Sequence, residues 1–309
     1  LRWLHKSWNA FWISFGIIGL LLIVIGAIGF GILQLQVTKT YIATQIEKNF
    51  SSKYEGVLTI GQLRGIVPMS FELKEVNLYP DSSSTEAVFH ADSLSASLDI
   101  FALLRQEFVV TGLSVSAPTV IIDGTKKDAF LAAIKKKPEI TLTDKEEAEK
   151  PFFEILAPNV IVRSGTVIIR QLFKPHQTFS SSDSLTFRDI DLSMFFEYKS
   201  SQRFLDINNL TMSIPELDVP KAQVYGQIYN NNRFLEFNSF NLNTSDTYLK
   251  FSGKSNDVDL FKGELLAQLR AASLDIDLNE LIVAPKRIKQ FIPNAPTLDK
   301  PIFVAMNIE

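Results

Sequence analysis

From residue 57 onward, apolar and polar residues alternate along much of the chain. The segments LSASLDI (94–100) and LDIDL (274–278) show this clearly, with an apolar residue at every second position and serine or aspartate between. Successive side chains of a β-strand point to opposite faces of the sheet, so the pattern is typical of strands with one buried and one wetted face. The sequence therefore predicts a mainly β body of antiparallel strands.

The alternation breaks in the same way at several places. Two polar residues, instead of one, separate apolar pairs at 71–78, 185–192, 205–212 and 235–242, and looser copies begin at Leu58, Phe108 and Val160. In a regular strand the extra residue would send the second pair to the opposite face, whereas a β-bulge returns it to the same face and increases the twist. We predict long, kinked strands in a curved, twisted sheet. The alternative is two short strands joined at each polar pair.

A long apolar segment precedes the β body. Residues 11–33 (FWISFGIIGLLLIVIGAIGFGIL) contain no charged residue and would span about 35 Å as a helix, enough for a bilayer core. A cleaved signal peptide has a shorter apolar region, of about 7–15 residues. Residues 1–38 are therefore predicted to form a cytoplasmic stub and an uncleaved transmembrane anchor, although the lysines and arginines on its two sides do not decide the orientation.

The segment that follows the anchor predicts a short helix. Val37, Tyr41, Ile42, Ile46 and Phe50 lie near one helical face, which indicates an amphipathic exit helix over residues 39–53. Two interpretations of this face are open: it contacts lipid, or it caps the end of the sheet.

A charged segment divides the β body. Ten of the sixteen residues from 135 to 150 are charged, which is typical of a solvated linker. We expect a first β part over 54–125, a helix and charged linker over 126–150, and a second β part over 151–309 that continues beyond a fragment of a longer protein. Helix-like stretches are also predicted at 99–106, 126–137 and 280–293.

Composition narrows the function more by exclusion than by motif. The chain has no cysteine and three widely spaced histidines, and its 31 basic residues are balanced by 34 acidic ones. Disulfides, thiolate catalysis and a basic nucleic-acid surface are therefore excluded. We find no metal-binding, phosphate-binding or nucleophile motif, so no enzyme activity, cofactor, catalytic residue or metal site is predicted.

The order of segments resembles a known family. An apolar anchor, an exit helix, VLTIGQLRGIVPMSFELKEVNLYP (57–80), a polar turn and HADSLSASLDIFALLRQEFVVTGLSVSAPTVIID (90–123) resemble the start of the AsmA-like and TamB family of Gram-negative envelope proteins. The resemblance implies an inner-membrane, single-pass protein with its bulk in the periplasm and a β sheet curled into a taco-like groove. It further implies phospholipid as cargo and an outer-membrane barrel protein of the TamA/BamA type as partner.

Three functions are compatible with these features. The first is a bridge whose apolar β groove conducts phospholipid between the inner and outer membranes, and the second is a scaffold or chaperone for outer-membrane protein assembly. The third is a β-sandwich spacer whose apolar faces close on one another. For the first, the side chains expected to line the lipid groove are Leu73, Val76, Leu78, Val110, Leu113, Val115, Ile207, Leu210, Met212, Phe237, Phe240 and Leu242.

Overall fold

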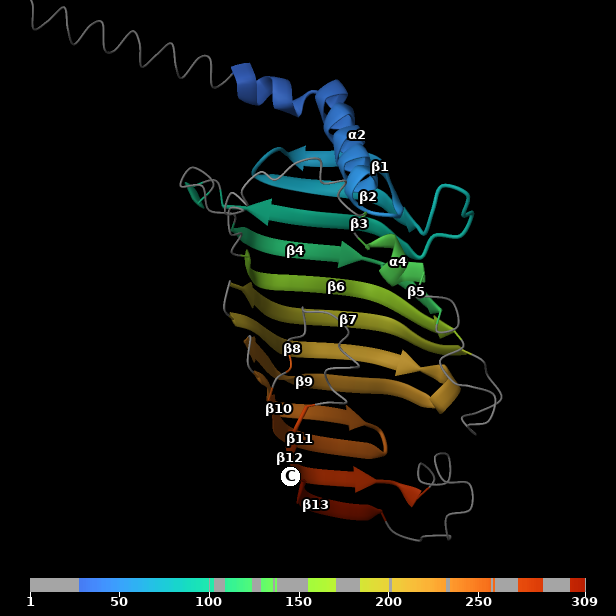
Figure 1. Ribbon diagram of the computed structural model, residues 1–309, viewed down its shortest axis with the longest axis vertical. Helices are drawn as coiled ribbons and strands as arrows, with labels where there is room; N and C mark the ends of the chain where they lie inside the picture. Colours follow the sequence, from blue (N-terminus) through green and yellow to red (C-terminus); the bar gives the residue numbers. More distant parts are fainter. Residues whose placement is uncertain are drawn as a thin grey trace, which may run out of the picture.

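The protein is mainly β, and its strands form one large curved sheet (Figure 1). The computed structural model describes residues 28–99, 101–102, 109–123, 129–135, 137, 155–170, 184–199, 202–231, 234–256, 258, 272–285 and 301–308. The helices are α2 (Gln36–Lys53), α4 (Ala129–Ala133) and the short 3-10 helix η1 (Pro215–Leu217). Residues 28–34 are also helical and meet α2 at a bend at Leu35.

Thirteen strands make up the sheet. They lie in the order β1-β2-β3-β4-β6-β7-β8-β9-β10-β11-β12-β13, and β5 pairs with β3 and β6. Their bounds are β1 Val57–Ile66, β2 Ser70–Tyr79, β3 Phe89–Leu98, β4 Val110–Ser116, β5 Thr119–Asp123, β6 Ile155–Arg170, β7 Ser184–Tyr198, β8 Gln202–Ile214, β9 Val219–Asn231, β10 Phe234–Thr244, β11 Thr247–Asn256, β12 Leu274–Val283 and β13 Ile302–Ile308.

The two predicted β parts share this single sheet. Strands β4 and β5 both pair with β6, and these two pairings are parallel, whereas the other pairings are antiparallel. The expectation of a wholly antiparallel sheet is therefore wrong at this junction. The 31 residues from 124 to 154 separate β5 from β6, and a parallel connection needs a dozen or more. The charged segment thus belongs to the connection between two parallel strands, β5 and β6.

Bulges occur at the repeated breaks in alternation. In β10, Phe237 pairs with Gly253 and Phe240 with Phe251, so a step of three residues on β10 matches a step of two on β11. Ser239, the second residue of that polar pair, has a φ of 48°. Comparable irregularities lie at residue 111 of β4, 163–164 of β6, 188–189 of β7 and 208–209 of β8. The predicted kinked strands are confirmed, and the alternative of separate short strands is wrong.

The first copy of the pattern, at residues 71–78 of β2, has a kink without a register shift. Residues 74–75 of β2 lie opposite Gly61 and Gln62 of β1, and the register on either side of them is unchanged. Strand β1 has its own pair of residues between apolar pairs at this point. Both strands therefore bend together, and equal numbers of residues on β1 and β2 lie opposite each other. Glu75 has a φ of 52°, which shows that the backbone kink itself is present.

Helix α2 closes the β1 end of the sheet. It lies across β1 and β2 in Figure 1, and its Ala43 belongs to a buried core with Ile60 and Leu63 of β1. Side chains of the helix also reach the free edge of β1: Glu47 accepts a hydrogen bond from the backbone N–H of Ile60 (2.6 Å), and Lys39 donates one to the carbonyl of Gly65 (2.7 Å). The capping interpretation of this helix is therefore confirmed.

The predicted apolar face of this helix is divided in two. Ile42 and Ile46 pack against the sheet core, and Phe50 packs against a second cluster that includes Ala133 of α4. Val37 and Tyr41 are instead exposed, so the expectation of one shared face for all five residues is wrong. A sheet edge is narrower than the arc that these positions cover on a helix.

Two further sequence predictions are corrected or untested by the structure. The predicted helix at 280–293 is wrong over 280–283, because these residues continue β12 and pair with β11 and β13. Within the described residues, no helix is both long and apolar enough to cross a membrane. Most of the predicted anchor, residues 1–27, and residues 103–106 of the predicted helix at 99–106 lie outside the described part of the chain.

Candidate functional site: the apolar face of the sheet

One apolar residue from each of twelve consecutive strands lies in a single row across the sheet. Neighbouring members of the row are paired residues, and paired residues on adjacent strands project to the same face. No polar residue interrupts the row in these strands. Its members, from β1 to β13 without β5, are Leu63, Leu73, Leu94, Val115, Val162, Leu192, Leu210, Val224, Leu242, Leu249, Leu281 and Val304.

A second row runs beside the first, two residues along most strands. It continues the same apolar face, which we call the apolar face from here on. Its members from β2 to β9 are Phe71, Ala96, Leu113, Val160, Met194, Ile207 and Gly226. On β10 to β12 they are Phe240, Phe251 and Leu278.

The register brings the predicted lining residues together on this face. Seven of the twelve belong to the two rows, on β2, β4, β8 and β10. The other five lie further along the same strands, either in alternation with row members or across a kink. Val110 pairs with Leu98, and Met212 with Ala222. Phe237 lies beside Phe240, with ring centroids 6.3 Å apart. Whether lipid lies on these residues stays a prediction.

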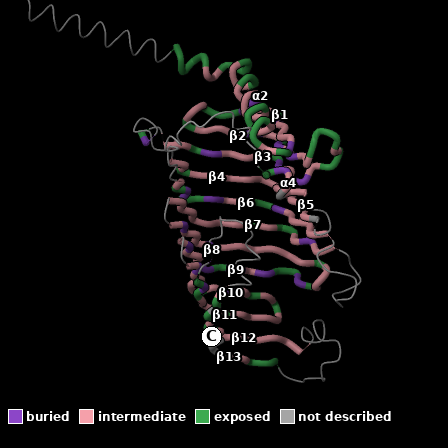
Figure 2. Tube along the Cα trace, in the orientation of Figure 1, coloured by how far each residue is buried: buried purple, intermediate pink, exposed green. Residues whose placement is uncertain are grey.

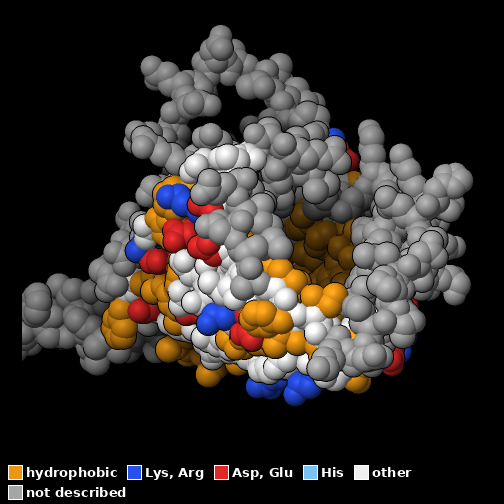
Figure 3. Space-filling view, turned by 90° about the horizontal axis from the view of Figure 1, so that it is seen from below, with side chains coloured by type: hydrophobic (Ala, Val, Ile, Leu, Met, Phe, Trp, Pro, Cys, Tyr) orange, Lys and Arg blue, Asp and Glu red, His pale blue; other side chains and the backbone are white. Residues whose placement is uncertain are grey.

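The two ends of the apolar face differ in their cover. Leu73 and Val76 are buried in the core beneath α2, and Leu78 is buried in the cluster with Ala133 of α4. These three predicted lining residues are therefore packed against protein. From β4 onward the predicted residues are mostly partly buried, as with Val115 and Leu210. In the view from below, a hollow lined by hydrophobic side chains is visible in the sheet (Figure 3).

An aromatic cluster lies at the β9 to β11 end of this face. The ring of Phe240 is 5.1 Å from that of Phe251, and Phe237 is 6.1 Å from Phe251, measured between centroids. Gly226 of β9 supports the cluster, because a Cβ atom there would lie 2.8 Å from the Cα of Phe240. The missing side chain is thus what lets β9 and β10 approach at this point.

The opposite face of the sheet carries cross-strand hydrogen bonds between polar side chains. Gln223 donates to Asn209 (2.9 Å), and Gln227 donates to Asp206 (3.1 Å), in both cases from β9 to β8. Such ladders keep polar side chains on the wetted face. Aromatic residues interrupt this face on β7 and β8, where the ring centroids of Phe195 and Phe204 lie 5.9 Å apart. The opposite face is therefore mixed, with polar ladders beside an aromatic group.

Sequence reasoning missed a polar group at one end of the apolar face. Arg203 of β8 is only 8% exposed, and its guanidinium lies 5.3 Å from the ring centre of Tyr198. The paired Asn230 is also buried and donates hydrogen bonds to the carbonyls of Phe234 (3.0 Å) and Val258 (2.9 Å). Alternation alone places these residues on the apolar face, but their polarity argued against burial.

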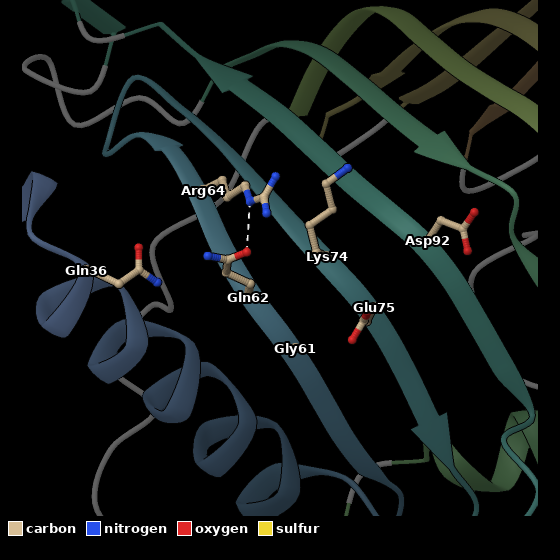
Figure 4. Close-up of a pocket in the computed structure, with 7 residues that line it drawn as sticks. All are labelled: Gln36, Gly61, Gln62, Arg64, Lys74, Glu75 and Asp92. Atoms are coloured by element: carbon tan, nitrogen blue, oxygen red, sulfur yellow. Dashed lines mark hydrogen bonds between the residues drawn. The ribbon is translucent and has the colours of Figure 1, made fainter.

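A polar pocket of about 510 Å³ lies over β1, β2 and β3, beside the start of α2 (Figure 4). Arg64 donates to Gln62 (2.8 Å), and Lys74 forms an ion pair with Glu72 (2.7 Å). The pocket is open and combines two cations with two anions, so its charges favour neither an anion nor a metal ion. Its lining residues are Gln36, Gly61, Gln62, Arg64, Lys74, Glu75 and Asp92.

Comparison with known proteins adds no family to these observations: no protein-family model matches the chain, and no curated protein matches it.

Proposed function

We propose that the protein is anchored in the inner membrane, stands in the periplasm, and conducts phospholipid between the inner and outer membranes along its apolar face. The observation that supports this most directly is the unbroken row of apolar residues, whose part from β4 to β13 lies beyond the cores packed beneath α2 and α4. The resemblance of residues 57–123 to AsmA-like and TamB proteins agrees with it. On this proposal the hollow is a taco-like groove, in which acyl chains lie while headgroups stay in water.

The energetics of such transport need no catalytic group. Each methylene that leaves water gains about 0.8 kcal/mol, so an acyl chain in the aqueous periplasm carries a large penalty. On a continuous apolar surface the acyl chain stays out of water at every step, so this free-energy cost does not arise. The polar side chains of the opposite face keep that side of the sheet hydrated. No enzyme activity or cofactor enters this proposal.

The experiment places charge in the middle of the apolar face. Ile207→Asp, Leu210→Asp and Phe240→Asp are combined in the full chain, and the control combines Asn209→Asp, Thr211→Asp and Asn243→Asp on the polar face of the same two strands. Mass spectrometry then measures the phospholipid that co-purifies with each variant. We expect severalfold less lipid with the first variant than with the control, which adds the same formal charge.

Two outcomes would reject the proposal. One is equal lipid on both variants, provided both retain the far-UV circular dichroism of the unchanged chain; the other is no lipid on any form of the protein, which favours a closed spacer. To test the scaffold alternative, prolines are placed on β13 to block strand pairing. Loss of outer-membrane protein assembly in that variant, with lipid retained, would favour the scaffold. At the β1 edge, Glu47 and Lys39 of α2 already occupy backbone groups.

A further inference from the structure

Large apolar side chains are exposed beside the β1–β2 turn. Ile66 at the end of β1 is 52% exposed, Met69 in the turn is 45% exposed, and Phe101 is 70% exposed. Apolar side chains scattered singly on a surface are ordinary, whereas a contiguous group indicates a contact surface. These three residues lie on segments that contact one another.

Backbone hydrogen bonds join the segments that carry these three residues. The backbone N–H of Leu98 donates to the carbonyl of Met69 (2.8 Å), which ties the end of β3 to the turn. One residue further on, Asp99 accepts hydrogen bonds from the backbone N–H groups of Phe101 (2.8 Å) and Ala102 (3.1 Å). Phe101 is therefore held three residues from the strand end that contacts the turn.

The helical segment before α2 belongs to the same surface. Gln34 donates a hydrogen bond to the carbonyl of Val67 in the turn (2.8 Å). Leu35 and Val37 next to it are 57% and 81% exposed. In Figure 1 the helical segment, the β1–β2 turn and residues 101–102 all lie on the upper left side of the molecule, and Figure 2 shows the start of the helical segment as exposed.

A lipid bilayer is the occupant that fits this surface. The helical residues 28–33 are the last part of the uncharged apolar segment 11–33, so the surface begins where the proposed anchor ends. Lys39 and the exposed Arg64 stand beside the apolar residues, and cations in that position attract lipid phosphates. Apolar side chains flanked by cations are typical of segments that lie in the membrane interface.

We propose that the β1–β2 turn and residues 101–102 insert into the interface of the bilayer that holds the anchor, so that this rim of the sheet sits on the membrane. The proposal rests on the proposed anchor, but not on lipid transport. It gives the sheet two attachments instead of one tether. The opposite rim of the same end, with the polar β2–β3 loop that contains Ser82, stays in water.

The absence of cysteine allows a direct test. Met69→Cys and Phe101→Cys are made singly in the full chain, with Ser82→Cys as the matched control because Ser82 is exposed at the opposite rim. Each thiol is labelled with an environment-sensitive fluorophore, and the chain is reconstituted in phosphatidylethanolamine and phosphatidylglycerol nanodiscs that contain a doxyl-lipid quencher. We expect blue-shifted emission and severalfold stronger quenching at positions 69 and 101 than at 82.

Equal quenching at all three positions would overturn the proposal, and so would water-like emission at 69 and 101. A second variant, Met69→Glu with Phe101→Glu, is read from a probe at Ile66→Cys: its quenching should fall severalfold, and unchanged quenching would count against insertion. Failure here is distinguishable from failure of the proposed function, because co-purifying phospholipid is measured separately.

Discussion

Gly226→Ala tests how closely β9 and β10 approach beneath the aromatic cluster. The new Cβ would lie 2.8 Å from both the Cα and a ring carbon of Phe240, whereas carbon atoms in contact are normally about 3.5–4.0 Å apart. The ring can rotate away, but the backbone Cα cannot. Gly226 also has a φ of 152°, a conformation that residues with a side chain rarely adopt.

The magnitude follows from these two causes. Overpacking costs about 1–3 kcal/mol, and an unfavourable backbone conformation adds about 1–3 kcal/mol. We expect the free energy of unfolding to fall by about 2–6 kcal/mol, a large share of the roughly 5–15 kcal/mol typical of a domain.

Gly112→Ala in β4 is the matched control. A Cβ there would meet only the carbonyl oxygen of Asn159, at an ordinary 3.9 Å. Since glycine weakens a strand interior by about 0.5–1 kcal/mol relative to alanine, this variant should be as stable as the unchanged chain or slightly more stable. Urea denaturation followed by far-UV circular dichroism compares the two. Equal stability of the two alanine variants would refute the reasoning.

A double variant separates the two contacts of Gly226. Adding Phe240→Ala removes the ring contact but leaves the contact with the backbone Cα. A double-mutant cycle should therefore show coupling between the two positions, with only part of the lost stability recovered.

Three other changes test the β1 end of the sheet and the β2–β3 loop. Leu73→Ala empties part of the core beneath α2 and should lower the free energy of unfolding by about 2–4 kcal/mol, read from the urea midpoint; a loss below about 1 kcal/mol would contradict the packed core. Glu47→Ala removes the acceptor of the Ile60 N–H, and hydrogen exchange of that amide should accelerate about tenfold, for a loss of about 1.4 kcal/mol; an unchanged rate would mean that α2 does not protect the edge. The hydrogen bond and positive charge of Arg170 hold the pKa of Glu86 below its ordinary value, so this carboxylate stabilises the fold above its unfolded pKa and loses that contribution as pH falls through the lower folded pKa. Arg170→Gln should raise the pKa of Glu86 in an NMR titration, and an unmoved titration would refute the assignment.

The kinked strands could be predicted from sequence because the alternation leaves few choices. Phe237 and Phe240 can share a face only if the two polar residues between them form a bulge or end the strand. The structure has the bulge, with Ser239 in a left-handed conformation. Local pattern was sufficient here, since which side chains share a face depends only on the backbone of the strand itself.

Features that depend on distant segments could not be predicted in the same way. The partner of β4 is decided by a long connection and not by the residues of β4 itself, so the parallel pairing with β6 leaves no mark in the alternation. The division of α2 into covered Ile42 and exposed Val37 depends on the width of the sheet edge. Burial of Arg203 beside Tyr198 likewise depends on where strands β7 and β8 end.

Because of the paired polar residues, the curvature of this sheet can change without a change in which side chains lie on each face. Deleting one residue of such a pair, Asn238 for instance, would leave strict alternation, so every apolar side chain would keep its face while the strand straightened. Inserting one residue would also make the spacing even, but it would place the middle one of three polar residues on the apolar face. Deletions at these positions are therefore single-residue steps by which evolution, or a designer, can widen or narrow the hollow while both of its surfaces stay the same.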